Sequence, residues 1–272
     1  MTINQTLEQL KAAFPDSDSK MPALFVGHGS PMNAIEDNEF SRAWAAVGKI
    51  LPSPKAILCV SAHWETNGTL VTAMERPRTI HDFGGFPRTL YEAQYPAPGS
   101  PELAQLTQQT VQKAPVGFDQ SWGLDHGAWS VLCHLFPDAD IPVIQLSLDH
   151  SQLPAYHYAL GKELRPLRNK GVLILGSGNM VHNLRLAFMQ EAAYDWAIEF
   201  DETLKGLIAT GDHQSIVHYQ EIGQTARLSV PTNEHYLPLL YALAVQDEQE
   251  GVRFFADRVT LGSISMRSVW IG

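Results

Sequence analysis

Residues 56–66 read AILCVSAHWET, in which five apolar residues and two small ones are followed by a histidine. A short, continuous apolar run of this kind is typical of a buried strand, and His63 stands where the run ends. Three further runs have the same composition, namely ALFV (23–26), PVIQLSL (142–148) and VLIL (172–175). Continuously apolar strands are typical of a parallel sheet that is covered on both faces.

Helix-like segments lie between these strands. In residues 100–114, Ser100 can cap a helix whose first turn holds Pro101, and residues 153–171 form a second such segment. Strands that alternate with helices predict an α/β fold. We therefore expect a single domain with a mostly parallel or mixed central sheet flanked by helices.

We expect the chain to divide into an N-terminal extension, 1–20, and one folded domain, 21–272. The extension is polar, with a short amphipathic helix expected at 6–14 and a linker at 15–20. No internal repeat or shift in composition indicates a second domain. The long segment 76–99 is rich in aromatic residues, proline and glycine, which is typical of a loop that covers a site.

The composition excludes several classes of partner. With 19 lysines and arginines against 29 acidic residues, the net charge is −10, so we expect no binding to nucleic acid or to a membrane. The start of the chain resembles no secretion signal, and no apolar run is long enough to span a bilayer. Cys59 and Cys133 lie in apolar stretches and are interpreted as reduced, buried thiols. We expect a cytoplasmic protein that binds a small molecule.

Five histidines occupy positions typical of a site. His28, His63 and His182 each follow a predicted buried strand, while His126 and His235 lie in polar breaks beside apolar segments. Because the carboxyl ends of parallel strands share one edge of a sheet, where ligand crevices form, these side chains can converge. The other six are weaker candidates. One belongs to the covering loop and the rest fit surface or packing roles: His81, His134, His150, His157, His213 and His218.

Neutral imidazole binds zinc and ferrous iron well, and a catalytic metal site needs about three protein ligands with positions left open. Three of the five histidines would suffice, with the metal at the carboxyl ends of the strands. Widely spaced histidines are less diagnostic than a compact zinc motif, so packed, metal-free histidines remain an alternative at this point.

Two other motifs lack the neighbouring residues that their usual functions require. The glycine-rich GSGNMV has Val181 where a dinucleotide-binding turn requires its third glycine. Ser30 and Ser177 stand beside glycines but not in the G-x-S-x-G motif of a nucleophile elbow. Ser30 is better explained as a helix cap that precedes Pro31.

Taken together, many segments match one family in order: MPALFVGHGSPMN, SAHWE, TIHDFGGFP, YPAPGSP, DHGAW, PDADIPVIQLSLD, GSGNMVHNLR, NEHYLPLLYAL and GSISMRSVWIG. They closely resemble the class III extradiol ring-cleavage dioxygenases, in particular the 4,5-DOPA dioxygenase branch. The resemblance extends over residues 21–272.

This resemblance implies an enzyme that adds both atoms of O2 beside the diol of a catechol such as L-DOPA, opening the ring to a semialdehyde. It implies one nonhaem divalent metal, Fe(II) for this activity, with Zn(II) present in some members. Matching the motifs assigns the metal ligands to His28, His63 and His235. His182 matches an acid/base histidine, which some descriptions count as a further ligand, and His126 a histidine that lines the substrate pocket.

The implied roles follow from this assignment. His182 would accept a proton from the catechol and return it later, a task suited to a histidine that titrates near neutrality. His126 would hydrogen-bond the developing oxygen species or the second hydroxyl of the catechol, and residues 81–87 of the covering loop would exclude water.

One departure concerns the third ligand, because related enzymes use a glutamate where this chain offers His235 beside Glu234. A third neutral ligand leaves more positive charge on the metal, which favours a dianionic catecholate but also suits zinc. Two other functions therefore remain alternatives, a zinc-dependent hydrolase and a nonenzymatic metal-dependent binding protein. The sequence leaves the oligomeric state open.

Overall fold

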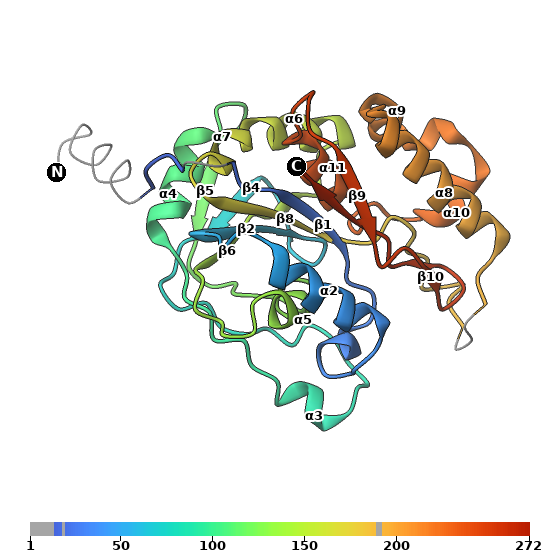
Figure 1. Ribbon diagram of the computed structural model, residues 1–272, viewed down its shortest axis with the longest axis horizontal. Helices are drawn as coiled ribbons and strands as arrows, with labels where there is room; N and C mark the ends of the chain where they lie inside the picture. Colours follow the sequence, from blue (N-terminus) through green and yellow to red (C-terminus); the bar gives the residue numbers. More distant parts are fainter. Residues whose placement is uncertain (1–13, 18–19, 189–191) are drawn as a thin grey trace.

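The computed structural model describes residues 14–17, 20–188 and 192–272. A central sheet runs through the molecule (Figure 1). In spatial order its strands are β6 (Val143–Gln145), β2 (Ala56–Ser61), β8 (Val172–Gly178), β1 (Ala23–Gly27), β12 (Ser268–Ile271) and β9 (Val252–Phe255). The four runs predicted from the sequence supply the first four of these strands.

The direction of the strands divides the sheet into two parts. β1, β8, β2 and β6 pair in parallel, whereas β12 and β9 run antiparallel along one edge. The prediction of an α/β domain with a mostly parallel or mixed sheet is therefore confirmed. Paired short strands outside this sheet are β3 (Glu65–Thr66) with β7 (Leu148–Asp149), β4 (Thr69–Thr72) with β5 (Val116–Asp119), and β10 (Val259–Thr260) with β11 (Ile264–Ser265).

Helices cover both faces of the sheet. Successive residues of β1 point to opposite sides, so Leu24 and Val26 contact one core while Ala23 and Phe25 contact the other. Figure 1 shows α2 and α5 on one side and α6 and α11 on the other. The α-helices are α2 (Glu39–Ile50), α3 (Arg88–Tyr91), α4 (Pro101–Thr110), α5 (His126–Leu135), α6 (Pro154–Glu163), α7 (Arg165–Arg168), α8 (Asp195–Thr210), α9 (His213–Val217), α10 (Gln224–Ser229) and α11 (Leu237–Ala244), and the 3-10 helices are η1 (Pro31–Ala34) and η2 (Tyr219–Ile222).

The predicted caps are present, but two helices are shorter than expected. The Ser100 hydroxyl accepts a hydrogen bond from the backbone N–H of Leu103, and Ser30 caps η1. α4 ends at Thr110 because the next residue adopts an extended backbone. The predicted helix 153–171 is divided into α6 and α7, since Pro166 has no N–H to continue the helical hydrogen bonds.

The N-terminal predictions lie mostly outside the described residues. Of the expected helix 6–14 only Phe14 is described, where it is buried in the core. Within the described part of the chain, no helix is long and apolar enough to cross a membrane.

Candidate metal centre and catalytic site

The structure brings the five candidate histidines together at the carboxyl edge of the sheet. His28 follows β1, His63 follows β2 and His182 follows β8, while His126 opens α5 and His235 precedes α11. Ring centroids lie 5.0 Å apart for His28 and His63, 5.3 Å for His28 and His235, and 5.0 Å for His63 and His235. Those of His63 and His126 lie 3.9 Å apart, and the His182 and His235 rings stack at 3.5 Å.

Two groups within this cluster have the ligand atoms that a metal ion needs. His28, His63 and His126 form one group, and His182, Glu234 and His235 form the other. In each group the candidate ligand atoms lie within 4.8 Å of one another. His235 links the groups, since its ring lies near those of His28 and His63 as well.

Ser177 fixes the tautomer of His28. The Ser177 hydroxyl donates its only hydrogen to the carbonyl of Gly127 at 2.5 Å, so it can only accept at the 3.0 Å contact with His28 Nδ1. His28 therefore carries its proton on Nδ1 and has a lone pair on Nε2. A hydrogen bond of this kind to the distal nitrogen is typical of metal-binding histidines.

The free Nε2 of His28 faces a second ligand nitrogen. It lies 3.1 Å from Nε2 of His63. Two histidine nitrogens bound tetrahedrally at about 2.0–2.1 Å from one zinc ion would lie roughly 3.3 Å apart. The pair therefore fits a shared metal ion.

Burial keeps these imidazoles neutral, the form that binds a metal. Burial and the neighbouring charge of His126 lower the pKa of His63 to about 4. Burial likewise lowers the pKa of His182 to about 4, against an opposing effect of Glu234. The pKa values of His28 and His235 also lie well below the ordinary value, first because of burial and then because other histidines surround them. His182 thus titrates below the near-neutral range expected from the sequence.

A buried network holds His126 in place. Asp125 caps α5 by accepting the backbone N–H of Ala128 at 3.2 Å. Its two carboxylate oxygens also accept hydrogen bonds from Ser61 at 2.6 Å and from the Gln145 side chain at 2.7 Å. The start of α5 is therefore fixed against the ends of β2 and β6.

Two glycines allow the histidines to approach the sheet. A Cβ on Gly178 would lie 2.1 Å from the carbonyl oxygen of His235, and one on Gly127 would lie 2.6 Å from the Ser61 hydroxyl. The glycines of GSGNMV and DHGAW thus permit close backbone packing beside the site.

Sequence reasoning missed the roles of two supporting residues. Asp82, in the covering loop, places its carboxylate between His63 and His126, and Ser177 orients His28. Burial raises the pKa of Asp82, but hydrogen bonds and charge from His126 and charge from His63 outweigh it, so the net pKa is lowered. The sequence feature that could have identified Asp82 is its position beside His81 in IHDFGG. His81 itself lies outside the cluster, with Nε2 2.9 Å from the carbonyl of Ala93.

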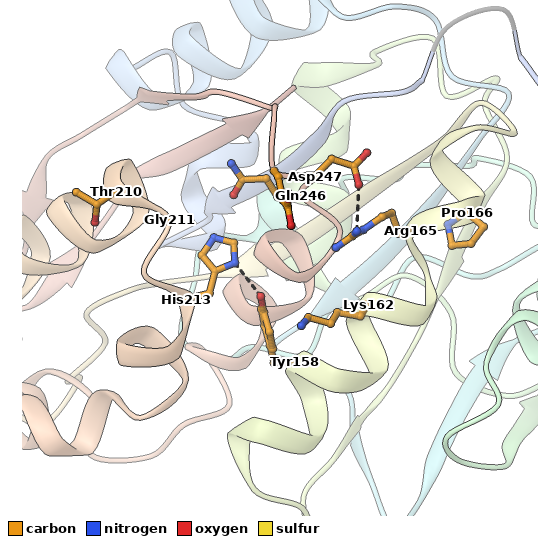
Figure 2. Close-up of a pocket in the computed structure, with 10 residues that line it drawn as sticks. Tyr158, Lys162, Arg165, Pro166, Thr210, Gly211, His213, Gln246 and Asp247 are labelled. Atoms are coloured by element: carbon orange, nitrogen blue, oxygen red, sulfur yellow. Dashed lines mark hydrogen bonds and ion pairs between the residues drawn. The ribbon is translucent and has the colours of Figure 1, made fainter.

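A separate cavity of about 700 Å³ lies between α6, α7 and the turns before α9 and after α11 (Figure 2). Its polar groups bind one another in part, because Tyr158 contacts His213 at 2.8 Å and Arg165 pairs with Asp247 at 3.0 Å. It contains none of the five clustered histidines, so the carboxyl edge of the sheet remains the candidate site.

An α/β sheet with a histidine cluster on its carboxyl edge defines a class of enzyme with a metal-capable centre. Residues 22–266 match the family model described as the catalytic LigB subunit of aromatic ring-opening dioxygenase. The chain is 49% identical over 263 residues to the 4,5-DOPA dioxygenase extradiol of Escherichia coli (strain K12), covering 94% of this chain and 96% of that protein. It is 39% identical over 240 residues to the 4,5-DOPA dioxygenase extradiol of Beta vulgaris, covering 85% and 89%.

A crystal structure of an uncharacterized protein from Escherichia coli K12 is also similar. It has a TM-score of 0.82 and 44% sequence identity, and the match covers 93% of this chain and all of that one. The chain therefore belongs to the LigB family of aromatic ring-opening dioxygenases, and the resemblance to the 4,5-DOPA dioxygenase branch is confirmed. The protein is an extradiol dioxygenase, an oxidoreductase that incorporates O2.

Proposed function

We propose that the enzyme cleaves the ring of a catechol such as L-DOPA by 4,5-extradiol addition of O2, with one nonhaem Fe(II) ion. The observation that carries this proposal is the convergence of five histidines, three buried and two half-buried, at the end of three parallel strands. The names of the two relatives support the choice of substrate. The proposed catalytic unit is residues 21–272.

The proposed ligands are His28, His63 and His235. Their rings lie 5.0–5.3 Å apart in every pair, with His28 and His235 buried and His63 half-buried. His182 stacks on His235, which also keeps it close enough to act as a further ligand. Zinc remains the alternative ion for this donor set.

The metal would bind the catechol oxygens and allow electrons to pass to O2. The protein supplies the remaining functions. Burial keeps the His182 ring neutral at pH 7, so one of its nitrogens has a lone pair that can accept the proton a catechol releases on binding. His126 lies beside His63, where its ring can accept a hydrogen bond from a catechol hydroxyl.

The covering loop excludes water in this proposal. The Phe83 ring packs edge-on against His126 with centroids 5.6 Å apart, and Phe86 packs against Phe83. An apolar cover of this kind protects a reactive intermediate from hydrolysis.

We also place the enzyme in the cytoplasm, with small-molecule substrate and O2 as its partners, because Cys59 and Cys133 are both free thiols.

Oxygen uptake tests the proposal. Metal-free protein is loaded anaerobically with Fe(II) and mixed with L-DOPA or a simple catechol, while oxygen and the yellow absorbance of a ring-opened semialdehyde are recorded. Uptake matched by product is expected, and the rates rank the substrates. A zinc hydrolase would instead require zinc and consume no oxygen, and a binding protein would bind the catechol without forming product.

A further inference from the structure

The covering loop inserts one carboxylate into the histidine cluster. Asp82 lies between β4 and α3, and only 18% of its side chain is exposed. Its Oδ1 accepts a hydrogen bond from the backbone N–H of His126 at 2.9 Å and lies 3.0 Å from Nδ1 of the same residue. Its Oδ2 lies 3.6 Å from Nδ1 of His63, an electrostatic contact rather than a hydrogen bond.

The loop is anchored on both sides of Asp82, so this carboxylate has a defined position. The backbone N–H of Ile80 donates to the carbonyl of Leu124 at 2.7 Å, and the indole of Trp129 donates to the carbonyl of Ile80 at 2.8 Å. On the other side, Phe83 packs against the rings of His126 and Trp129. The loop is thus bound to the first turns of α5, which also carry His126.

The carboxylate lies beside the same ring atom, Nδ1, of two histidines, at 3.0 Å from His126 and 3.6 Å from His63, and both contacts are electrostatic rather than aligned hydrogen bonds. A negative charge beside Nδ1 favours the tautomer with its proton there and leaves the lone pair on Nε2. In His63 the Nε2 atom that keeps the lone pair is the one that lies 3.1 Å from Nε2 of His28. Ser177 has the corresponding role for His28, so each ring of this group has a partner behind it.

We infer that Asp82 is a positioning residue that sets the tautomer and orientation of His63 and His126, and thereby joins the covering loop to the catalytic centre. This inference rests on the proposed function, because it concerns the same metal site. It identifies the loop as part of the site rather than only its cover.

The test compares Asp82→Asn with the wild-type protein. Asparagine can still accept the backbone N–H of His126, so the loop keeps its anchor, but it has neither the charge nor the second acceptor. Zn²⁺ affinity, measured by competition with a chelator, is expected to weaken about 10–100-fold. Imidazole ¹⁵N NMR of the metal-free protein should show that the His63 and His126 signals shift away from the Nδ1–H tautomer.

Asp149→Asn is the matched control, because Asp149 is also buried and accepts a backbone N–H, that of Ser151 at 3.1 Å, away from the cluster. It should leave Zn²⁺ affinity unchanged. If Asp82→Asn does not fold, Asp82→Glu, which retains the charge, should retain the Nδ1–H tautomers. Wild-type zinc affinity and tautomers in Asp82→Asn, or lost tautomers in a folded Asp82→Glu, would overturn the inference. Neither readout needs turnover, so failure of the wild-type enzyme to consume oxygen would reject the proposed function without deciding the role of Asp82.

Discussion

The two ends of the central sheet bury polar groups in opposite ways. At the amino end, Arg168 is fully buried and its guanidinium makes two hydrogen bonds of 2.7 Å to Glu250. It also donates to the carbonyls of Met21 and Val245, both at 2.7 Å. At the carboxyl end, His28 and His63 instead direct ligand nitrogens at each other from 3.1 Å.

The difference shows which buried polar cluster has a structural role and which is suited to function. A buried charge with a bidentate partner has its hydrogen bonds satisfied, and removing either partner destabilises the fold. Neutral imidazoles that face one another gain nothing comparable, yet they form a ready set of metal ligands.

The largest effect is expected from His63→Ala, which removes one ligand of the proposed site. Stoichiometric metal binding should be abolished, while the metal-free protein stays folded because this side chain is partly exposed. Metal content measured after dialysis checks this. His157→Gln is the control, since His157 is buried against the hydroxyl of Tyr241 outside the cluster. A fully metallated His63→Ala protein would rule out His63 as a ligand.

His182→Gln should separate chemistry from metal binding at the same end of the sheet. Glutamine cannot act as the acid and base, so turnover should fall about 10²–10⁴-fold while one metal ion per chain is retained. Steady-state kinetics and metal analysis of the same sample check both parts. His213→Gln, in the separate cavity of Figure 2, should match the wild type. Unchanged turnover in His182→Gln would exclude His182 from the mechanism.

Arg168→Met removes the buried ion pair at the amino end of the central sheet. The variant leaves Glu250 without its bidentate partner, and the free energy of unfolding should fall by about 3–5 kcal/mol. Metal stoichiometry should not change at a temperature where the variant is folded. Urea unfolding measures the loss, and Arg42→Met, which removes an exposed ion pair to Asp37, should cost only about 0–1 kcal/mol. Equal losses in the two variants would contradict the structural role of Arg168.

The smallest expected effect is a difference between the pH ranges over which the two ends of the sheet lose stability. Burial lowers the pKa of His182 from 6.5 to about 4, so protonation favours the unfolded state, and this contribution to the stability of metal-free protein is lost as pH falls from 6.5 towards 4. Burial raises the pKa of Glu250, but Arg168 and Lys20 outweigh it and lower the pKa from 4.5 to about 2. The stability from Glu250 is therefore lost between pH 4.5 and 2.

Urea unfolding of metal-free protein across this pH range measures both contributions. His182→Gln should reduce the slope of stability against pH in the higher window, which His28, His63 and His235 share, and Glu250→Gln should reduce it in the lower one. If both variants flattened the same window, the two ends would not titrate as separate sites.

The comparison of the two ends of the sheet also shows which features the sequence could predict. Apolar runs located four strands of the sheet, and the histidines that follow three of them were expected at one edge. The run 142–148 was predicted as one strand, but it splits into β6 and β7 because the chain leaves β2 after Leu146, and the Ser147 backbone N–H bonds the carbonyl of Leu70. Strand composition does not specify such a change of partner.

The supporting residues of the site were harder to predict. Asp82 contacts His126 across 44 residues, and Ser177 contacts His28 across 149 residues. Neither pairing has a local periodicity, because it depends on how the loop and the strands pack in three dimensions. The antiparallel strands β12 and β9 likewise join the sheet through tertiary pairing.

The most direct test of the central claim is an anaerobic titration of metal-free protein with Fe(II), in which the rate of oxygen uptake with L-DOPA is measured after each addition. If the carboxyl-edge histidines form the catalytic centre, the rate should rise linearly and stop rising at one iron per chain. A protein that binds one iron per chain and consumes no oxygen with any catechol would contradict the claim.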